Sequence, residues 1–293
     1  MDRRQFLKLI GLSSLFSGMA LRELYAADGP VVAVAEDSDY SRAAVRAVNA
    51  LGGMGRFVRP GDTVVVKPNI GWDRRPEQAA NTHPLVVRAV AAEALRAGAK
   101  KVKVFDRTCN DPRRCYVNSG IEGALRGMKG VELKHVEEER FRKVRLNGKI
   151  LREWELYDEA LSADVLINVP IAKHHGLTGL TLGLKNVMGV MGGDRGAVHR
   201  HIDAALADIN AVLKSRLTII DATRILTAHG PAGGDLRDVK VLNKVIASTD
   251  IVAADAYATT LFGMKPDRIS VTVAAWLRGL GEMNTARMKI VKA

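Results

Sequence analysis

Cysteine and aromatic residues are scarce in this sequence, and their scarcity excludes several kinds of protein. The 293 residues include two cysteines, so this chain cannot by itself supply the four thiolates of an ordinary iron–sulfur cluster. Aromatic residues make up 5% of the sequence, and aliphatic side chains must therefore fill most of the core. No stretch interleaves aromatic and basic residues in the manner of a nucleic-acid-binding segment, so no nucleic-acid partner is expected.

Long runs of like charge are also missing, although the formal net charge is +12. A basic chain can bind nucleic acid, anionic lipid or anionic small molecules. Because the charges are scattered along the chain, we interpret most of them as a solvated surface. The sequence is 47% hydrophobic and 26% charged, which is typical of a globular protein with enough apolar material for a large core.

The first 26 residues predict an export signal rather than part of the fold. A twin-arginine pattern, Arg3 to Lys8, precedes a moderately apolar run, and Ala26 supplies a small residue at the cleavage point. The run is short and rich in Gly and Ser for a membrane span, and an uncleaved anchor is the alternative. We therefore expect the twin-arginine translocase as a partner, membrane contact only in transit, and a periplasmic or otherwise exported location.

Apolar runs alternate with helical patterns along residues 27–293, which we expect to form a single α/β domain. Strands are predicted at 31–35, 62–67, 102–105, 131–136, 144–151, 165–169, 217–220 and 241–247. Helices are predicted at 42–51, 84–97, 118–128, 202–213, 250–262 and 270–280. Continuous apolar strands are typical of parallel sheets covered on both faces. The predicted fold is a mostly parallel, doubly wound sheet flanked by helices, with a small β-hairpin around Asn147-Gly148, as one body or as two lobes around a cleft.

Polar side chains follow four of these strands, at the edge where open α/β sheets bind their ligands. The residues expected to bind an anionic substrate or cofactor are Lys67, Asn69, Asp106, Lys185, Asn186 and Asp221. The residues expected to be catalytic are Lys173, His174 and His175. Histidine suits acid–base work, and a desolvated lysine can act as a base or a Schiff-base amine. Each position alone also fits a surface lysine or an Asp that caps a helix.

The segment that carries Lys185 and Asn186 has two interpretations. Its apolar residues recur at helical spacing: Leu177, Leu180, Leu184, Met188 and Met191. A helix of this register would place Thr181 and Lys185 together on another side. Three glycines weaken that helix, so a glycine-rich loop over phosphates is the alternative, without the spacing of a P-loop or a dinucleotide fingerprint.

Histidine and cysteine pairs suggest two further features. His199 and His201 are candidate ligands of a divalent metal, although their spacing is not that of a recognised zinc site. Cys109 and Cys115 flank a proline-containing segment, which in an exported protein predicts a disulfide. A two-thiol metal site is the alternative for this pair.

Several of these motifs together resemble a family known as a domain of unknown function, DUF362. The matching pieces are Val66-Lys67-Pro68-Asn69, Asn81-Thr82-His83-Pro84, Asp164 to Pro170, Lys173 with His175, Thr178 to Thr181, Leu184-Lys185-Asn186, Ile220-Asp221-Ala222, Ala247 to Asp250, and Asp255-Ala256. The resemblance covers nearly all of residues 27–293 and implies a site at these motifs. Many relatives also carry a ferredoxin-like iron–sulfur module, which this sequence lacks, and the family resembles the nickel-dependent lactate racemases at the level of architecture.

The resulting hypothesis is an exported enzyme that acts on an anionic small molecule or cofactor in a cleft lined by lysine and histidine. Two alternatives remain: a non-catalytic periplasmic protein that binds a ligand or metal cofactor, and a subunit of an exported redox complex. The sequence does not specify the cofactor.

Overall fold

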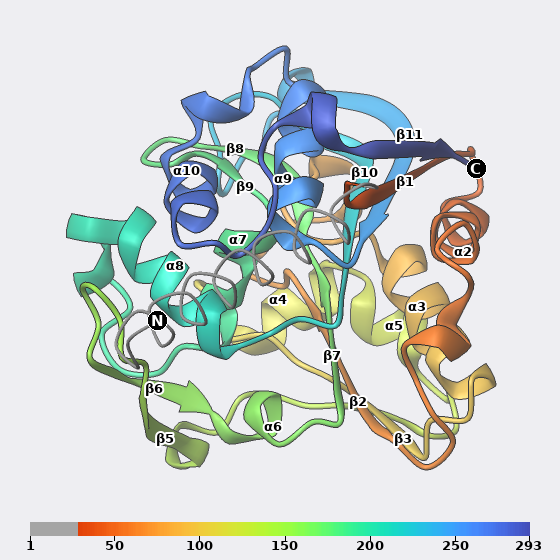
Figure 1. Cartoon of the computed structure of the whole chain (residues 1–293). Coiled ribbons are helices and arrows are strands. Elements are labelled where there is room, and N and C mark those ends of the chain that lie inside the picture. The colour runs from red at the N-terminus through yellow and green to blue at the C-terminus, as the bar shows by residue number, and fades with distance from the viewer. Residues whose placement is uncertain (1–28) are drawn as a thin grey trace, which may run out of the picture.

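The computed structural model describes residues 29–293, and the predicted twin-arginine segment lies outside them. The described residues are built on one large mixed sheet with the strand order β12-β1-β11-β10-β7-β2-β3-β4 (Figure 1). Its strands are β1 (Val31–Glu36), β2 (Thr63–Pro68), β3 (Lys101–Val104), β4 (Val131–Leu133), β7 (Val165–Val169), β10 (Leu217–Leu226), β11 (Val239–Ser248) and β12 (Lys289–Lys292).

Parallel pairing dominates the centre of this sheet. β10, β7, β2, β3 and β4 all run in the same direction, while β11 is antiparallel to both β10 and β1. β2 and β7 are buried along almost their whole length, as expected for strands covered on both faces. The predicted mostly parallel α/β fold is confirmed.

Helices cover both faces of the sheet (Figure 1). One face carries α2 (Tyr40–Asn49), α3 (Pro84–Arg96), α4 (Pro112–Asn118) and α5 (Ile121–Leu125). The other carries α7 (Gly183–Asn186), α8 (Ile202–Val212), α9 (Ile251–Thr260) and α10 (Ser270–Leu277), and the short helix α6 (Asp158–Leu161) precedes β7. Within residues 29–293 no helix combines the length and the apolar character that crossing a membrane requires.

Two stretches between β3 and β7 differ most from the predicted elements. The hairpin is formed by β5 (Phe141–Arg145) and β6 (Glu153–Tyr157), so the predicted strand 144–151 is wrong. Its centre is a loop because Asn147 has a positive φ of 47° and Asp208 accepts the backbone N–H groups of residues 149–151. Residues 112–118 form α4, which begins six residues before the predicted helix 118–128, because Asp111 caps its first turn and Pro112 occupies that turn. The predicted helix itself is reduced to α5.

The segment from Pro170 to Val190 forms neither a long helix nor a phosphate loop. After Pro170 the chain continues as β8 (Ile171–His175), which pairs with β10 and turns back as the antiparallel strand β9 (Gly179–Thr181). Gly179 has a φ of 72°, which favours glycine and interrupts the helical pattern. The short helix α7 and a 3-10 turn, Val187–Val190, then follow.

Candidate functional site

A cavity of about 570 Å³ lies beyond the carboxyl ends of β2, β3 and β7. Eight of the residues predicted to bind an anion, act in catalysis or bind a metal line it: Lys67, Asn69, Asp106, Lys173, His175, Lys185, Asn186 and His199. They come from segments that are far apart in the sequence. These segments meet here because adjacent parallel strands end at the same edge of a sheet. Asp106 is the one carboxylate among the described residues of this wall, which also contains three lysines and two arginines.

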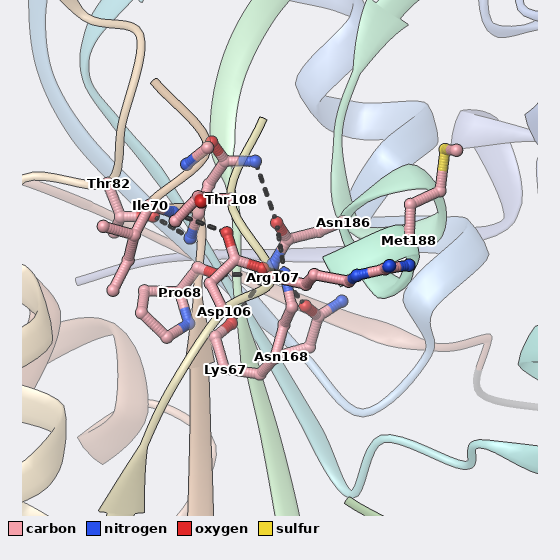
Figure 2. Close-up of polar contacts among 12 residues, drawn as sticks. Lys67, Pro68, Ile70, Thr82, Asp106, Arg107, Thr108, Asn168, Asn186 and Met188 are labelled. Carbon is pink, nitrogen blue, oxygen red and sulfur yellow. Dashed lines mark hydrogen bonds and ion pairs between the residues drawn. The ribbon is translucent and has the colours of Figure 1, made fainter. Parts of the chain in front are cut away.

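Lys67 belongs to a network of polar contacts in the wall of the cavity, which Figure 2 shows. Its Nζ donates to the carbonyl of Pro68 at 3.0 Å and to Oδ1 of Asn186 at 3.1 Å, and it lies 2.7 Å from Oδ1 of Asp106. This third contact is a buried ion pair. Three surrounding oxygens, one of them charged, match the three donors of an ammonium group. Burial lowers the pKa of Lys67, and Asp106 opposes that shift.

Asn186 holds the network together with all four hydrogen-bonding positions of its amide. Its Oδ1 accepts from Lys67 and from Asn69, and its Nδ2 donates to the carbonyl of Lys67 and to Oδ1 of Asn168 (Figure 2). An amide with two donors and two accepted bonds has no capacity left for a ligand. Asn186, predicted as a ligand-binding residue, is therefore placed to position Lys67 and Asn69.

Asp255 holds the helical turn α7, which carries Asn186, through hydrogen bonds to its first residues. Its carboxylate accepts the N–H groups of Gly183 at 2.7 Å and of Leu184 at 2.9 Å, at the start of α7. Burial raises the pKa of Asp255 to about 7. Asp255 therefore determines where α7 presents Lys185 and Asn186.

Gly189 allows the Lys67–Asp106 pair to fit beneath the 3-10 turn. A Cβ added there would overlap Oδ1 of Asp106 and lie 2.5 Å from Nζ of Lys67. The backbone carbonyl of Gly189 also accepts the N–H of Arg107 at 2.9 Å. Any side chain at this position would have to displace the buried ion pair.

Lys173 differs from Lys67 in its partners. It is 1% exposed, and its Nζ donates to the carbonyl of Ala80 at 2.6 Å and to Oδ1 of Asn69 at 3.2 Å. Both acceptors are uncharged, and the third neighbour is the ring of Trp72, 5.9 Å away at its centroid. Burial lowers the pKa of Lys173 to about 7, with further lowering by Lys185 and Lys67.

Lys185 and Arg195 supply positive charge at the cavity wall. Nζ of Lys185 contacts Sδ of Met188 at 3.5 Å, which leaves donors free for a ligand. Burial lowers the pKa of Lys185 to about 8. Arg195 donates to the carbonyls of Arg107 and Thr108 at 2.9 and 2.8 Å, which fixes its guanidinium without neutralising it. Arg195 is not among the site residues predicted from the sequence.

His175 faces the cavity as a neutral hydrogen-bond donor. Its Nδ1 accepts the N–H groups of Leu177 at 3.1 Å and Thr178 at 3.4 Å, which assigns the ring proton to Nε2. Burial, together with Lys185 and Lys173, lowers the pKa of His175 to about 3. At neutral pH the ring therefore offers an N–H to a ligand.

Thr181 contributes a hydroxyl without a partner. It lies on β9 opposite Lys173, is 4% exposed and lines the cavity, and its Oγ1 makes no hydrogen bond within the described residues. A buried polar atom left unsatisfied is destabilising unless something else binds to it. The hydroxyl therefore points to a ligand, a signal that only the folded structure supplies.

His174, Asp221 and His201 do not line the cavity. His174 points to the other side of β8, where its Nδ1 accepts the N–H of Gly230 at 3.1 Å. Asp221 lies inside β10, which continues five residues beyond it, and its oxygens accept from His83 N–H and from Thr223. Both residues organise the loops around the site, and His201 is exposed.

The predicted disulfide is not formed. Both cysteines are free thiols: Cys115 is buried in α4 against the core, and Cys109 is exposed and lines the cavity. Cys115 lies on α4 and Cys109 lies in the segment that precedes this helix. Among residues 29–293, no three His, Cys, Asp or Glu side chains are grouped so that they could hold a metal ion, so the predicted pair His199–His201 has no third ligand of this kind.

The fold and the cavity define an α/β protein with a basic cavity at the carboxyl edge of its sheet. The model of the family described as "Domain of unknown function (DUF362)" matches residues 64–260, and the chain belongs to this family. A relative, the thylakoid-associated protein sll1697 of Synechocystis sp., is 31% identical over 240 residues, which cover 78% of this chain and 72% of the relative.

Two solved structures are also similar to the chain. A protein from Thermotoga maritima has a TM-score of 0.49 at 14% identity, and the lactate racemase apoprotein from Thermoanaerobacterium thermosaccharolyticum has a TM-score of 0.44 at 11% identity. The matches cover 78% and 77% of this chain. They span only 60% and 55% of the length of the solved chains.

Proposed function

We propose that the protein is an enzyme that binds and transforms an anionic small molecule in the cavity above Lys67. The proposal rests mainly on one observation, the excess of positive charge and hydrogen-bond donors around the cavity. Ammonium, guanidinium, imidazole and hydroxyl groups line it, whereas the described residues of its wall include one carboxylate, Asp106, which is already paired with Lys67. Such a surplus of buried positive charge is destabilising without a counter-charge and favours an anion. Lys185 and Arg195 would bind the anionic group, while His175 and Thr181 would donate to a neighbouring oxygen.

Sulfate is the simplest probe of this site. Calorimetric titration is expected to show binding to the wild-type protein and at least about a tenfold weaker affinity for Lys185→Met, a loss of about 1.4 kcal/mol. The matched control is Lys143→Met, because Lys143 lies on the β5–β6 hairpin with 71% of its side chain exposed. Equal sulfate affinity in all three proteins would refute an anion site at Lys185.

The pH dependence of the same titration provides a second control. A bound anion stabilises the ammonium forms of Lys185 and Lys173, whose pKa values are lowered to about 8 and about 7. Binding must then take up protons, and sulfate affinity is expected to be highest below pH 7 and to fall between pH 7 and 9. An affinity that stays constant over this range would assign the site to groups other than these lysines.

Turnover separates an enzyme from the two alternatives. A ligand that co-purifies in the cavity and is never converted would indicate a binding protein for a ligand or metal cofactor. A tightly co-purifying redox subunit would instead indicate a component of an exported complex.

We also propose that the protein acts outside the cytoplasm after export by the twin-arginine translocase. The Arg3-Arg4 pattern supports this location, and so does the thylakoid association in the name of the Synechocystis relative. The double substitution Arg3→Lys and Arg4→Lys is expected to retain the full-length chain in the cytoplasm, as measured by cell fractionation. Lys143→Met, on the β5–β6 hairpin and outside this pattern, is the control, and unchanged export of the double variant would contradict the proposal.

A further inference from the structure

Two buried lysines in the cavity wall have different protonation chemistry, which can be read from their neighbours. Lys67 is surrounded by three oxygens, one of them a carboxylate oxygen, and these match the three N–H bonds of an ammonium group. Lys173 has two oxygen acceptors, both uncharged. A neutral amine carries two N–H bonds and one lone pair. The two acceptors of Lys173 therefore satisfy a neutral amine and leave its lone pair unoccupied.

The groups around Lys173 suit a reaction at a carbonyl carbon. Lys173 and His175 are two residues apart on β8, and Thr181 is directly opposite Lys173 on β9, so the three side chains share one face of the hairpin. His175 presents Nε2–H, and Thr181 presents the unpartnered hydroxyl. Two neutral donors beside a nucleophile can stabilise the negative charge that develops on a carbonyl oxygen under attack. Lys185 and Arg195 remain for an anionic substituent.

We infer that Lys173 forms an imine with an aldehyde or ketone that carries a carboxylate group, such as a 2-oxo acid. This inference rests on the proposed anion site and specifies its substrate class. The amine lone pair forms a C–N bond while the C=O π electrons move to oxygen, and an amine proton passes to that oxygen. The hydroxyl group then leaves with one solvent proton as water, which gives an iminium. One N–H remains on the iminium for the carbonyl of Ala80.

The electrostatic surroundings support a reactive amine at this position. Because burial lowers the pKa of Lys173 to about 7, a substantial fraction of its side chains is neutral at pH 7. An exposed lysine of ordinary pKa has a neutral fraction roughly a thousandfold smaller. Desolvation and neighbouring positive charge are the two ways in which proteins activate a lysine nucleophile.

Reductive trapping tests the inference. The full-length protein is incubated at pH 7 with glyoxylate and sodium cyanoborohydride, and the product is mapped by peptide mass spectrometry. The expected result is one carboxymethyl group on Lys173, formed well before any on exposed lysines. Glycolate, which has the carboxylate but no aldehyde or ketone group, is expected to slow the labelling by competition. Lys173→Met should lose the fast adduct, whereas Lys143→Met should keep it.

The outcomes distinguish this inference from the proposed function. Sulfate binding without a preferred adduct at Lys173 would overturn the imine and leave the anion site standing. Absence of both sulfate binding and adduct would overturn both. Labelling spread evenly over surface lysines also counts against the imine, and the site of the adduct in the wild-type protein decides this even if Lys173→Met fails to fold.

Discussion

Asp106→Asn is expected to destabilise the protein by about 3–5 kcal/mol, because it leaves the ammonium of Lys67 buried without its counter-charge. Each of the two side chains is only 3% exposed, so water compensates little for the lost carboxylate. Urea denaturation at pH 7 measures the free energy of unfolding. A change below about 1 kcal/mol would show that the pair is not coupled as the distances indicate.

The double variant Lys67→Met/Asp106→Asn is the control for this effect. It removes the unpaired charge and is expected to recover much of the stability lost in Asp106→Asn, as in other buried pairs. In Asp106→Asn itself, stability should rise with pH up to the pKa of an unfolded lysine. The reason is that burial lowers the pKa of Lys67 in the folded protein, and the variant lacks the carboxylate that opposes this shift, so the unfolded chain binds more protons than the folded chain.

Gly189→Ala is expected to destabilise the protein by about 1–3 kcal/mol and to weaken sulfate binding by more than about tenfold. The new methyl group would overlap Asp106 and force the pair with Lys67 apart. Thermal unfolding and the sulfate titration measure the two effects.

Gly123→Ala provides the comparison for Gly189→Ala. Gly123 lies in α5, and a Cβ there meets nothing within 4 Å. Replacing a helical glycine by alanine is expected to be neutral or stabilising by up to about 1 kcal/mol, with sulfate binding unchanged. Similar behaviour of the two variants would mean that the space above the Lys67–Asp106 pair is larger than the structure shows.

The position of the cavity could be predicted from the sequence, because residues that follow parallel strands lie together at the carboxyl edge of the sheet. Lys67, Asp106 and Lys173 each come after an apolar run, and parallel strands bring such residues to one edge. The same rule failed for Asp221, because β10 continues past it and local pattern does not reveal how far a strand extends. The chain around Thr181 was misjudged because its apolar spacing fits a helix, whereas pairing with β8 makes it a strand.

Chemical roles were less accessible to sequence reasoning than positions. The difference between Lys67 and Lys173 depends on whether a distant carboxylate or a distant carbonyl lies next to each amine. Cys109 and Cys115 are a similar case, because their sequence spacing fits a bridge, whereas Cys115 is buried in α4 and Cys109 is exposed in the segment before that helix. Three-dimensional neighbours, rather than residue types, decide these properties.

The polar network joins residues that are far apart in the sequence, and this separation affects how the protein folds. Lys67 and Asn186 bind each other across 119 positions of the chain, and the strands between them must pair in parallel first. Contacts of such sequence separation form late and slowly during folding, because the loops between them must close before any contact is gained. A newly synthesised chain therefore has no working pocket until its C-terminal half has joined the sheet, and ligand capture should report completion of folding rather than its early stages.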